Sequence, residues 1–400
     1  MKGDFESAFE QLDRLEDKKV SPENLIKIRR VLDVLLIGEF YGLPTLKSIL
    51  SVLGIKSTNL YKLWRAQKFG EIKKLALNLS LGDFEQALSK LAKQSDASWS
   101  RSQVTVIVDD SIFKTWLKNM PRGAYYDKFF SGQIKRTVHG FRVSLIGVAI
   151  GDDFYPLYFQ VVPKGGDTKK VALNLLKKVQ DVFTKVADKE DVAYPNLYFS
   201  ADSGFTYDKL IKYCEQKNIG FIGVPKKTNV FTFQEGSMNL KSYIEKEFIP
   251  QEVAYKAERK RAGKEEEPFL LRVRCYYKAQ GREVVLLFFR LKGSNKVTVI
   301  FCSHLAVMKK TLRRRFFQRT KIELFFRFLK DTLKIQKSKS ERYGDFVKKL
   351  SVCIIKAIFC IKLQKFFRKK HRTFKGWSYY KIRQHIIYHQ VHKSILEDLI

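Results

Sequence analysis

The chain carries the segment RRRFFQRTKIELFFRFLK at residues 313–330, which places one carboxylate, Glu323, among many cations. At the roughly 100° per residue of an α-helix, Arg319, Glu323 and Lys330 fall on one narrow face. A separate apolar arc consists of Ile322, Phe325, Leu329 and Leu333. We therefore expect a helix that rests on a core and presents a carboxylate flanked by cations. Such a carboxylate can hold a metal ion beside a phosphate backbone.

The chain is strongly basic. It has 76 Lys or Arg and 41 Asp or Glu in 400 residues, a formal net charge of +35. This sign and size make nucleic acid the leading partner. The excess is largest near the C-terminus, where the residues from Phe346 to Leu396 include 13 Lys or Arg and no Asp or Glu. Residues 346–400 are therefore predicted to form a basic helical tail that binds a polyanion.

An anionic membrane surface is the competing partner for so basic a chain. No apolar run reaches the roughly 18 to 20 residues that span a bilayer. The longest candidate, Val352 to Leu363, is interrupted by two lysines and is interpreted as a packed helix. The N-terminus has no apolar signal-peptide region, so we expect a cytoplasmic protein with no membrane partner. The five cysteines have no zinc-finger spacing, which argues against disulfides and structural zinc.

Residues 1–100 show apolar residues at helical spacing. Within them, residues 44–66 hold two short helical patterns joined by a glycine turn, and Ser57 stands where the second helix would be capped. This pattern is typical of a helix-turn-helix, which reads DNA in the major groove, although a plain helical hairpin explains it equally well. We expect a helical N-terminal DNA-binding domain.

From Val104 the pattern changes to apolar strands alternating with amphipathic helices. The predicted strands are 104–108, 139–150, 154–162, 197–201 and 221–224, and the predicted helices are 168–187 and 208–217. Between 226 and 303 a charged loop at 258–267 precedes three further predicted strands, at 269–277, 283–291 and 296–302. The sequence thus predicts an α/β fold with a mixed sheet, interrupted by a β-rich insertion.

Acidic residues follow two of the predicted strands: Asp109, or its neighbour Asp110, and Asp202. Glu323 would be a third acid, and only tertiary folding could bring the three together. Any one of them alone is explained as a turn residue or a helix cap. Three carboxylates suit Mg²⁺ or Mn²⁺, and a pair of such ions can promote phosphodiester cleavage.

These motifs together resemble the DDE transposases of bacterial insertion sequences, in the cut-and-paste group. The signature of that group is Tyr, two residues, Arg, three residues, Glu, six residues, Lys. Phe316, Arg319, Glu323 and Lys330 match this spacing, with Phe in place of Tyr. The segments around Asp109 and Asp202 resemble the two other acidic motifs of the family. The resemblance covers about residues 104–334.

The resemblance implies a ribonuclease H-like catalytic core at residues 101–225 and 304–345, with the insertion at 226–303 between its two parts. It implies that Asp109, Asp202 and Glu323 bind the metal, two Mg²⁺ or Mn²⁺ ions. Asp109 is preferred to Asp110 because the family usually has a hydroxyl residue two positions after its first acid, and Ser111 fits. The register that uses Asp110 stays open.

The resemblance also assigns roles in DNA binding. Arg319 and Lys330 would hold the DNA backbone near the cleaved end, and Arg313, Arg314 and Arg315 would add phosphate contacts. Phe316 lacks the phenol hydroxyl of the signature tyrosine, so it could stack on DNA but not donate a hydrogen bond.

The predicted function is that of a transposase that binds the terminal inverted repeats of its element and carries out metal-dependent DNA cleavage and strand transfer. The expected partners are double-stranded DNA and a second copy of the chain, and the expected location is the bacterial cytoplasm, at the nucleoid. Two alternatives remain: another ribonuclease H-like nuclease such as a resolvase, and a catalytically decayed DNA-binding relic. His385, His389 and His392 share one helical face, but a basic tail explains them more simply than zinc does.

Overall fold

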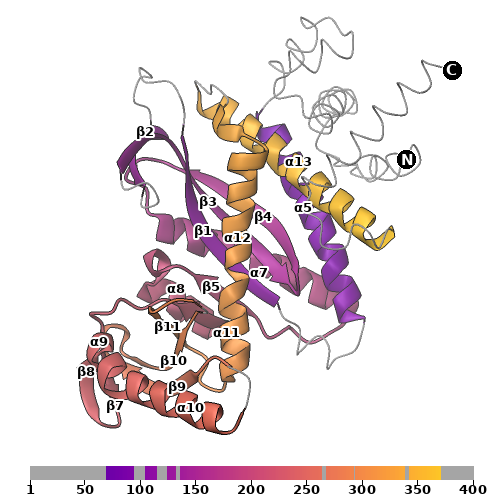
Figure 1. The fold of residues 1–400 in the computed structure, drawn as a ribbon. Coiled ribbons are helices and arrows are strands. Elements are labelled where there is room, and N and C mark those ends of the chain that lie inside the picture. Colours follow the sequence, from indigo (N-terminus) through magenta and orange to yellow (C-terminus); the bar gives the residue numbers. More distant parts are fainter. Residues whose placement is uncertain are drawn as a thin grey trace, which may run out of the picture. The chain divides into compact units, whose positions relative to one another are not determined.

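The computed structural model (Figure 1) describes residues 69–93, 104–114, 124–131, 136–263, 267–291, 293–337 and 342–370. The helix-turn-helix candidate at 44–66 and the three histidines of the tail lie outside the described residues.

The chain divides into two compact units. Unit 1 comprises the described parts of residues 1–83, 112–141 and 325–400. Unit 2 comprises Phe84–Ser111 and Arg142–Leu324. Glu323 lies near the end of a segment of unit 2, and the chain continues into unit 1 from Phe325.

Unit 2 is built on a mixed sheet in the order β4-β3-β1-β5-β6-β11-β10-β9-β7-β8. Its strands are β1 Val104–Lys114, β3 Arg136–Ile150, β4 Asp153–Val162, β5 Tyr198–Ala201, β6 Gly220–Gly223, β7 Val230–Phe233, β8 Gly236–Asn239, β9 Leu270–Tyr277, β10 Arg282–Arg290 and β11 Val297–Cys302, of which β1 and β3 continue into unit 1. The parallel pairs β1–β5 and β5–β6 form its centre, and antiparallel strands flank them. The predicted mixed sheet is confirmed, and it is consistent with a ribonuclease H-like fold.

The predicted strands 139–150 and 154–162 are also confirmed, and they form a hairpin. β3 pairs antiparallel with β4 from Arg142↔Val162 to Ile150↔Asp153. Gly151 makes the turn with a φ of 54°, in the left-handed region that glycine adopts without a steric penalty.

The helices of unit 2 are α7 Thr168–Glu190, α8 Asp208–Gln216, α9 Leu240–Tyr243, α10 Ile249–Arg261 and α11 Lys309–Gln318, followed by α12 Thr320–Arg327 across the boundary between the units. The side chain of Asp167 caps α7 by accepting a hydrogen bond from the backbone N–H of Lys169 at 2.9 Å. This cap fixes the start of the helix. The buried side chains of α7, such as Leu176 and Val179, recur at helical spacing.

The region 226–303 contains the three predicted strands, as β9, β10 and β11 (Figure 1). It also contains helices that the sequence analysis did not predict. α10 begins with Pro250 in its first turn and runs through Arg261, so the first part of the predicted charged loop at 258–267 is helical. The last turn of α10 holds Arg259, Lys260 and Arg261, whose charges favour a helix C-terminus.

Unit 1 contains α5 Phe69–Ala92, which continues into unit 2, β2 Tyr126–Ser131, and α13 Tyr343–Lys370. β2 was not predicted, and it pairs with the part of β3 that lies in unit 1. Phe346 of α13 stacks on Phe141 with ring centroids 4.2 Å apart. The packed helix predicted at Val352–Leu363 is confirmed as part of α13. No described helix is long and apolar enough to span a membrane.

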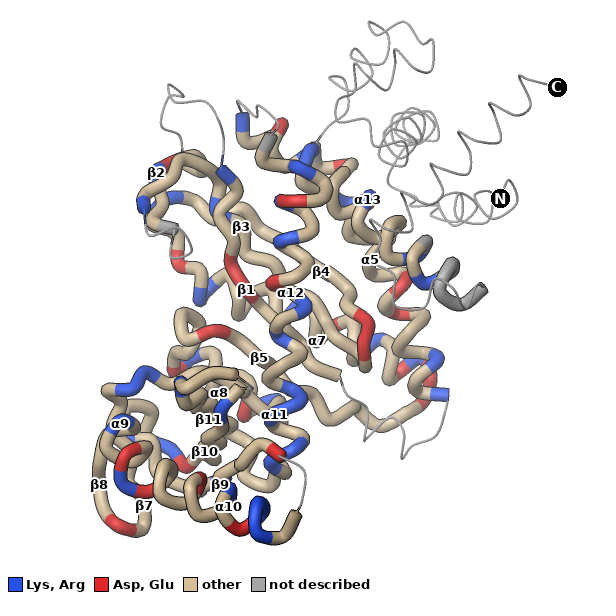
Figure 2. The backbone as a smooth tube through the Cα atoms, viewed as in Figure 1, with Lys and Arg blue, Asp and Glu red and all other residues tan. Residues whose placement is uncertain are grey.

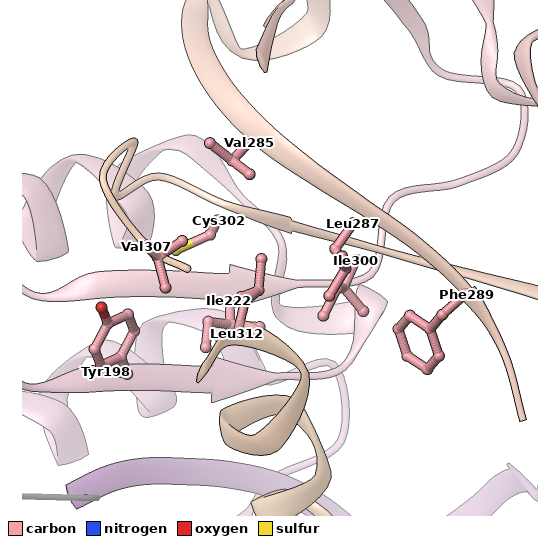
Figure 3. Close-up of a cluster of buried hydrophobic side chains, with 9 residues drawn as sticks. All are labelled: Tyr198, Ile222, Val285, Leu287, Phe289, Ile300, Cys302, Val307 and Leu312. Carbon is pink, nitrogen blue, oxygen red and sulfur yellow. The ribbon is translucent and has the colours of Figure 1, made fainter. Parts of the chain in front are cut away.

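One apolar cluster of unit 2 fixes α11 on the sheet (Figure 3). Its residues are Tyr198, Ile222, Val285, Leu287, Phe289, Ile300, Cys302, Val307 and Leu312. Leu312 is the member that α11 supplies, and it has no solvent exposure. Burying a leucine side chain contributes about 2 kcal/mol, so this contact holds the basic helix on strands β5, β6, β10 and β11.

Candidate functional site

The pairing of β1 with β5 sets the positions of Asp109 and Asp202. The two strands are parallel and in register from Thr105↔Tyr198 to Val108↔Ala201. Asp109 and Asp202 each occupy the next position, although 93 residues separate them in the sequence. Asp202 follows the last residue of β5, as predicted. Asp109 does not end its strand, because β1 continues to Lys114 beside β3.

Asp202 begins a short turn at the C-terminal end of β5. Its Oδ1 atom accepts the backbone N–H of Ser203 at 2.7 Å and caps the 3₁₀ turn Ser203–Phe205. About half of its side chain (52%) is exposed, so the carboxylate is accessible to a ligand from solvent.

The helical segment that carries Glu323 is divided at Arg319, between α11 and α12. There the backbone N–H of Arg319 donates to the carbonyl of Phe316 and that of Ile322 donates to the carbonyl of Arg319, at 3.1 and 3.2 Å. These three-residue spacings tighten the helix locally. The apolar arc predicted for the segment is confirmed, since Ile322, Phe325, Leu329 and Leu333 are all buried.

Arg319 links two of the predicted acids. Its Nη2 atom lies 2.9 Å from Oε1 of Glu323, and its Nη1 atom lies 3.9 Å from Oδ1 of Asp202. The guanidinium also lies over the ring of Phe316, 5.7 Å from the centroid. The Arg319–Glu323 pair is local to the helix, whereas the Arg319–Asp202 pair joins the helix to the end of β5.

Asp109 has a strongly raised pKa. Burial raises its pKa from 3.8 to about 7. The backbone N–H of Asp110, which donates to Asp109 at 2.8 Å, and the charge of Arg319 act to lower this pKa, while the charges of Glu323 and Asp110 raise it. Asp109 is thus close enough to Arg319 and Glu323 for their charges to act on it, and its own charge is incompletely compensated.

Asp110 has different surroundings. Successive side chains of a strand point to opposite faces, so Asp110 is directed away from the face of Asp109. It accepts a hydrogen bond from the hydroxyl of Ser144 on β3. Burial raises its pKa to about 6, and Ser144 and Arg142 act to lower it. Arg319 and Glu323 do not contribute to this pKa, so the geometry associates Asp109 with them.

The chemistry of this group fits a hard divalent cation. Its donors are carboxylate oxygens, which Mg²⁺ and Mn²⁺ prefer, and the incompletely compensated charge of Asp109 would gain from a nearby cation. In the part of the chain that the structure describes, no three His, Cys, Asp or Glu side chains are arranged as a metal site. In the structure, the cation that contacts both Asp202 and Glu323 is the guanidinium of Arg319.

The three consecutive arginines predicted to contact DNA, Arg313, Arg314 and Arg315, differ in their exposure. Arg314 is exposed, and with Lys309 and Lys310 it gives α11 a basic surface, seen as blue segments of the tube in Figure 2. Arg313 is partly covered, and its guanidinium lies 5.2 Å from the ring centroid of Phe317.

Arg315 corrects the sequence-based prediction. It is only 4% exposed, its guanidinium lies 4.9 Å from the ring centroid of Tyr198, and its Nη1 atom donates to Thr105 at 3.3 Å. Burial lowers its pKa to about 10. The helix turns this side chain toward the sheet, so Arg315 holds α11 in place and does not face solvent, where DNA would bind.

Phe316 and Lys330, the other two residues of the signature, have surroundings that differ from those of Arg319 and Glu323. Phe316 packs edge-on against Phe317 and is only partly exposed. Lys330 belongs to unit 1, where its Nζ atom lies 5.3 Å from the ring centroid of Phe113.

Two polar residues near the site were not predicted from the sequence. These are Thr105 and Gln318, which form a buried hydrogen bond between β1 and α11. A signal was available for each of them. Thr105 is the polar member of an apolar strand, and Gln318 is one of two uncharged polar residues of a basic segment.

A mixed sheet whose central parallel strands lead to carboxylates beneath a basic, acid-bearing helix defines a class of protein suited to act on phosphate esters. A comparison with known protein families identifies one family. The family of the transposase DDE domain matches residues 102–358, which is more than half of the chain, and the chain belongs to this family. No curated protein matches the chain. The resemblance found in the sequence is thereby confirmed as a DDE transposase, and the signature of the cut-and-paste group stays a prediction.

Proposed function

We propose that this transposase binds the terminal inverted repeats of its element and catalyses metal-dependent DNA cleavage and strand transfer, with Asp109, Asp202 and Glu323 as the metal ligands. The observation that supports the proposal is the register of β1 with β5, in which Asp109 and Asp202 each follow the last paired residues, together with the contacts of Arg319 to Asp202 and Glu323. The family match supports transposition as the process.

Mg²⁺ or Mn²⁺ ions, two in number, would activate the attacking oxygen and stabilise the leaving oxygen of the phosphodiester. The three carboxylates would hold these ions at one edge of the parallel strands. Arg319, which balances the charge of Asp202 and Glu323 in the structure, would then be available to hold a DNA phosphate. The exposed cations of α11, Arg314 among them, would bind the DNA backbone on the same helix.

We propose that the rest of the chain serves DNA binding and assembly. Residues 1–100 would recognise the terminal repeats, with 44–66 as the candidate reading element, and the basic tail at 346–400 would add backbone contacts. The catalytic core would comprise 101–225 and 304–345, with 226–303 as its insertion. Two copies of the chain would pair two DNA ends in a homodimer. The net charge of +35 supports an extended DNA interface.

The test is a cleavage and strand-transfer assay on linear DNA that carries the sequences flanking the native gene, with Mg²⁺ or with EDTA. Asp202→Ala and Glu323→Ala each remove a proposed ligand, so we expect cleavage to fall at least about a hundredfold while DNA affinity is kept. Asp188→Ala changes an exposed acid on α7 and is the matched control, with activity expected to be unchanged.

Each alternative predicts a different outcome of this assay. Full activity of Glu323→Ala would remove the site assignment. Cleavage of branched DNA without a need for defined ends and without strand transfer would indicate a resolvase. Binding without cleavage by every variant, the unmodified chain included, would indicate a catalytically decayed relic.

A further inference from the structure

Polar side chains are buried where α11 crosses the central strands of unit 2. Thr105 of β1 has no solvent exposure, and Arg315 and Gln318 of α11 are 4% and 5% exposed. Buried polar groups of this kind are costly unless they are paired, so the contacts among them restrict how the helix can lie.

The contacts converge on Thr105. Its hydroxyl donates a hydrogen bond to Oε1 of Gln318 and accepts one from Nη1 of Arg315 at 3.3 Å. Arg315 also covers the ring of Tyr198, which is the partner of Thr105 in the register of β1 and β5. Nε2 of Gln318 donates to the carbonyl of Gly151 at 3.4 Å, in the turn between β3 and β4. One turn of α11 is therefore tied to β1, β5 and the β3–β4 turn.

This polar cluster stands in a fixed relation to the acidic site. Thr105 and Tyr198 precede Asp109 and Asp202 by four residues each, so all four side chains belong to the same face of the sheet. Four residues of strand span about 13 Å. On the helix, Glu323 follows Arg315 by eight residues, which correspond to a rise of about 12 Å. The distance from the polar cluster to the acids is therefore about the same along the strands as along the helix.

Between the polar cluster and the acids, the shared face of the sheet has few polar groups that could set the position of the helix. Ile107 is apolar, and the buried hydroxyl of Ser200 has no hydrogen-bond partner among the described residues. The apolar contact of Leu312 with the cluster in Figure 3 attracts the helix without direction, because hydrophobic burial is insensitive to small shifts along the axis. Directional hydrogen bonds to Thr105 do oppose such shifts.

We propose that Thr105 and Gln318, together with Arg315, are positioning residues that set the register of the helix on the sheet and thereby place Glu323 opposite Asp109 and Asp202. This role rests on the proposed function of the three acids. A shift of the helix by about 1 Å would change the spacing of the carboxylates by an amount that divalent cations do not tolerate.

The test compares Thr105→Val, which keeps the shape of the side chain and removes the hydroxyl, with Thr105→Ser, which restores it. Gln318→Leu removes the partner and serves as a second variant if Thr105→Val does not fold. Ser351→Ala is the matched control, because it deletes a fully buried hydroxyl that donates to the carbonyl of Val347 at 2.8 Å in α13 of unit 1. Each full-length variant is measured for Mn²⁺ affinity, cleavage rate, DNA affinity and hydrogen exchange.

We expect Thr105→Val and Gln318→Leu each to weaken Mn²⁺ binding and to slow cleavage by roughly tenfold, because each removes the buried Thr105–Gln318 hydrogen bond and one further contact of the same side chain, with DNA affinity unchanged. Thr105→Ser and Ser351→Ala should keep the Mn²⁺ affinity of the unmodified chain. The effects of Thr105→Val and Gln318→Leu should be less than additive in the double variant, because both changes break the Thr105–Gln318 bond while each also removes one further contact, from Arg315 to Thr105 or from Gln318 to Gly151. Faster amide exchange should be confined to residues around 315–323.

Equal Mn²⁺ affinity and equal exchange in Thr105→Val, Thr105→Ser and the unmodified chain would overturn the positioning role. A loss of Mn²⁺ affinity in Ser351→Ala as large as that in Thr105→Val would also overturn it, since any buried hydroxyl would then have the same effect. If the unmodified chain neither binds Mn²⁺ nor cleaves DNA, the proposed function fails. Hydrogen exchange then decides the register role alone: local acceleration in Thr105→Val supports it, and unchanged exchange refutes it.

Discussion

Replacing Asp109 by Asn removes the carboxyl group whose charge is most poorly accommodated in the site. Burial raises the pKa of Asp109 from 3.8 to about 7. This rise corresponds to about 4 kcal/mol between the two protonation states as an upper limit, and to about 2 kcal/mol once solvent screening of the partly exposed side chain is allowed for. Asn has nearly the same shape and no charge, so the substitution isolates this cost.

The sign of the effect follows from the raised pKa. A carboxyl group whose pKa is higher in the folded chain stabilises the fold fully below 3.8, and this contribution is lost as the pH rises through about 7. In EDTA, the free energy of unfolding of the unmodified chain should therefore fall by about 2 kcal/mol more than that of Asp109→Asn between pH 4 and pH 8. At pH 8, Asp109→Asn should be the more stable protein.

Divalent metal should reverse this order. Mn²⁺ bound by the ionised Asp109 stabilises the folded state by mass action, so the unmodified chain should gain stability with increasing Mn²⁺ at pH 8 and Asp109→Asn should gain little. The assay is urea unfolding with and without Mn²⁺. Asp110→Asn is the matched control: its carboxyl also has a raised pKa, about 6, but it contacts Ser144, so the Mn²⁺ response should survive.

Two outcomes would refute the reasoning. If the stability of Asp109→Asn fell with pH as steeply as that of the unmodified chain, burial of Asp109 would not be the cause. If Asp110→Asn lost the Mn²⁺ response while Asp109→Asn kept it, the first ligand would be Asp110.

Further predictions concern the arginines. Arg319→Ala removes the cation that contacts Asp202 and Glu323, so Mn²⁺ affinity should rise several-fold by calorimetry while DNA cleavage falls; weaker Mn²⁺ binding would contradict this competition. Arg314→Ala should leave stability within about 0.5 kcal/mol and reduce the salt dependence of DNA binding by roughly one phosphate contact, measured by titration at several salt concentrations. Arg315→Ala should do the reverse, losing about 2 to 4 kcal/mol in urea unfolding with the salt dependence unchanged, because the side chain is buried. A reduced salt dependence in Arg315→Ala would instead support the original assignment of Arg315 to phosphate.

Several features of the fold and site were predictable because they depend on neighbours in the sequence. The hairpin at Gly151 follows from two apolar strands around a turn, and the Asp167 cap follows from its place before an amphipathic helix. The pairing of Arg319 with Glu323 follows from their spacing of four on one helix. The order of the acidic motifs was enough to identify the family, which the match over residues 102–358 confirms.

Other features could not be read from local patterns. α10 occupies part of a segment expected to be a loop, because charged residues without apolar periodicity resemble a loop until a partner covers one face. β2 was missed because its residues alternate weakly. Arg315 was assigned to DNA because a run of three arginines gives no sign of which one faces the sheet.

The sequence by itself determined the strands and helices with a clear apolar period, the basic character of α11 and the three acidic motifs, since each depends on composition or on a period of two or 3.6 residues. Tertiary structure alone decided which residues meet. The parallel register of β1 on β5 gave Asp109 and Asp202 matching positions after the paired residues, and the direction of each helical side chain buried Arg315 while leaving Arg319 in contact with Asp202 and Glu323. Contacts between residues about 100 to 200 positions apart depend on how strands pair and helices pack, and no local period encodes that choice.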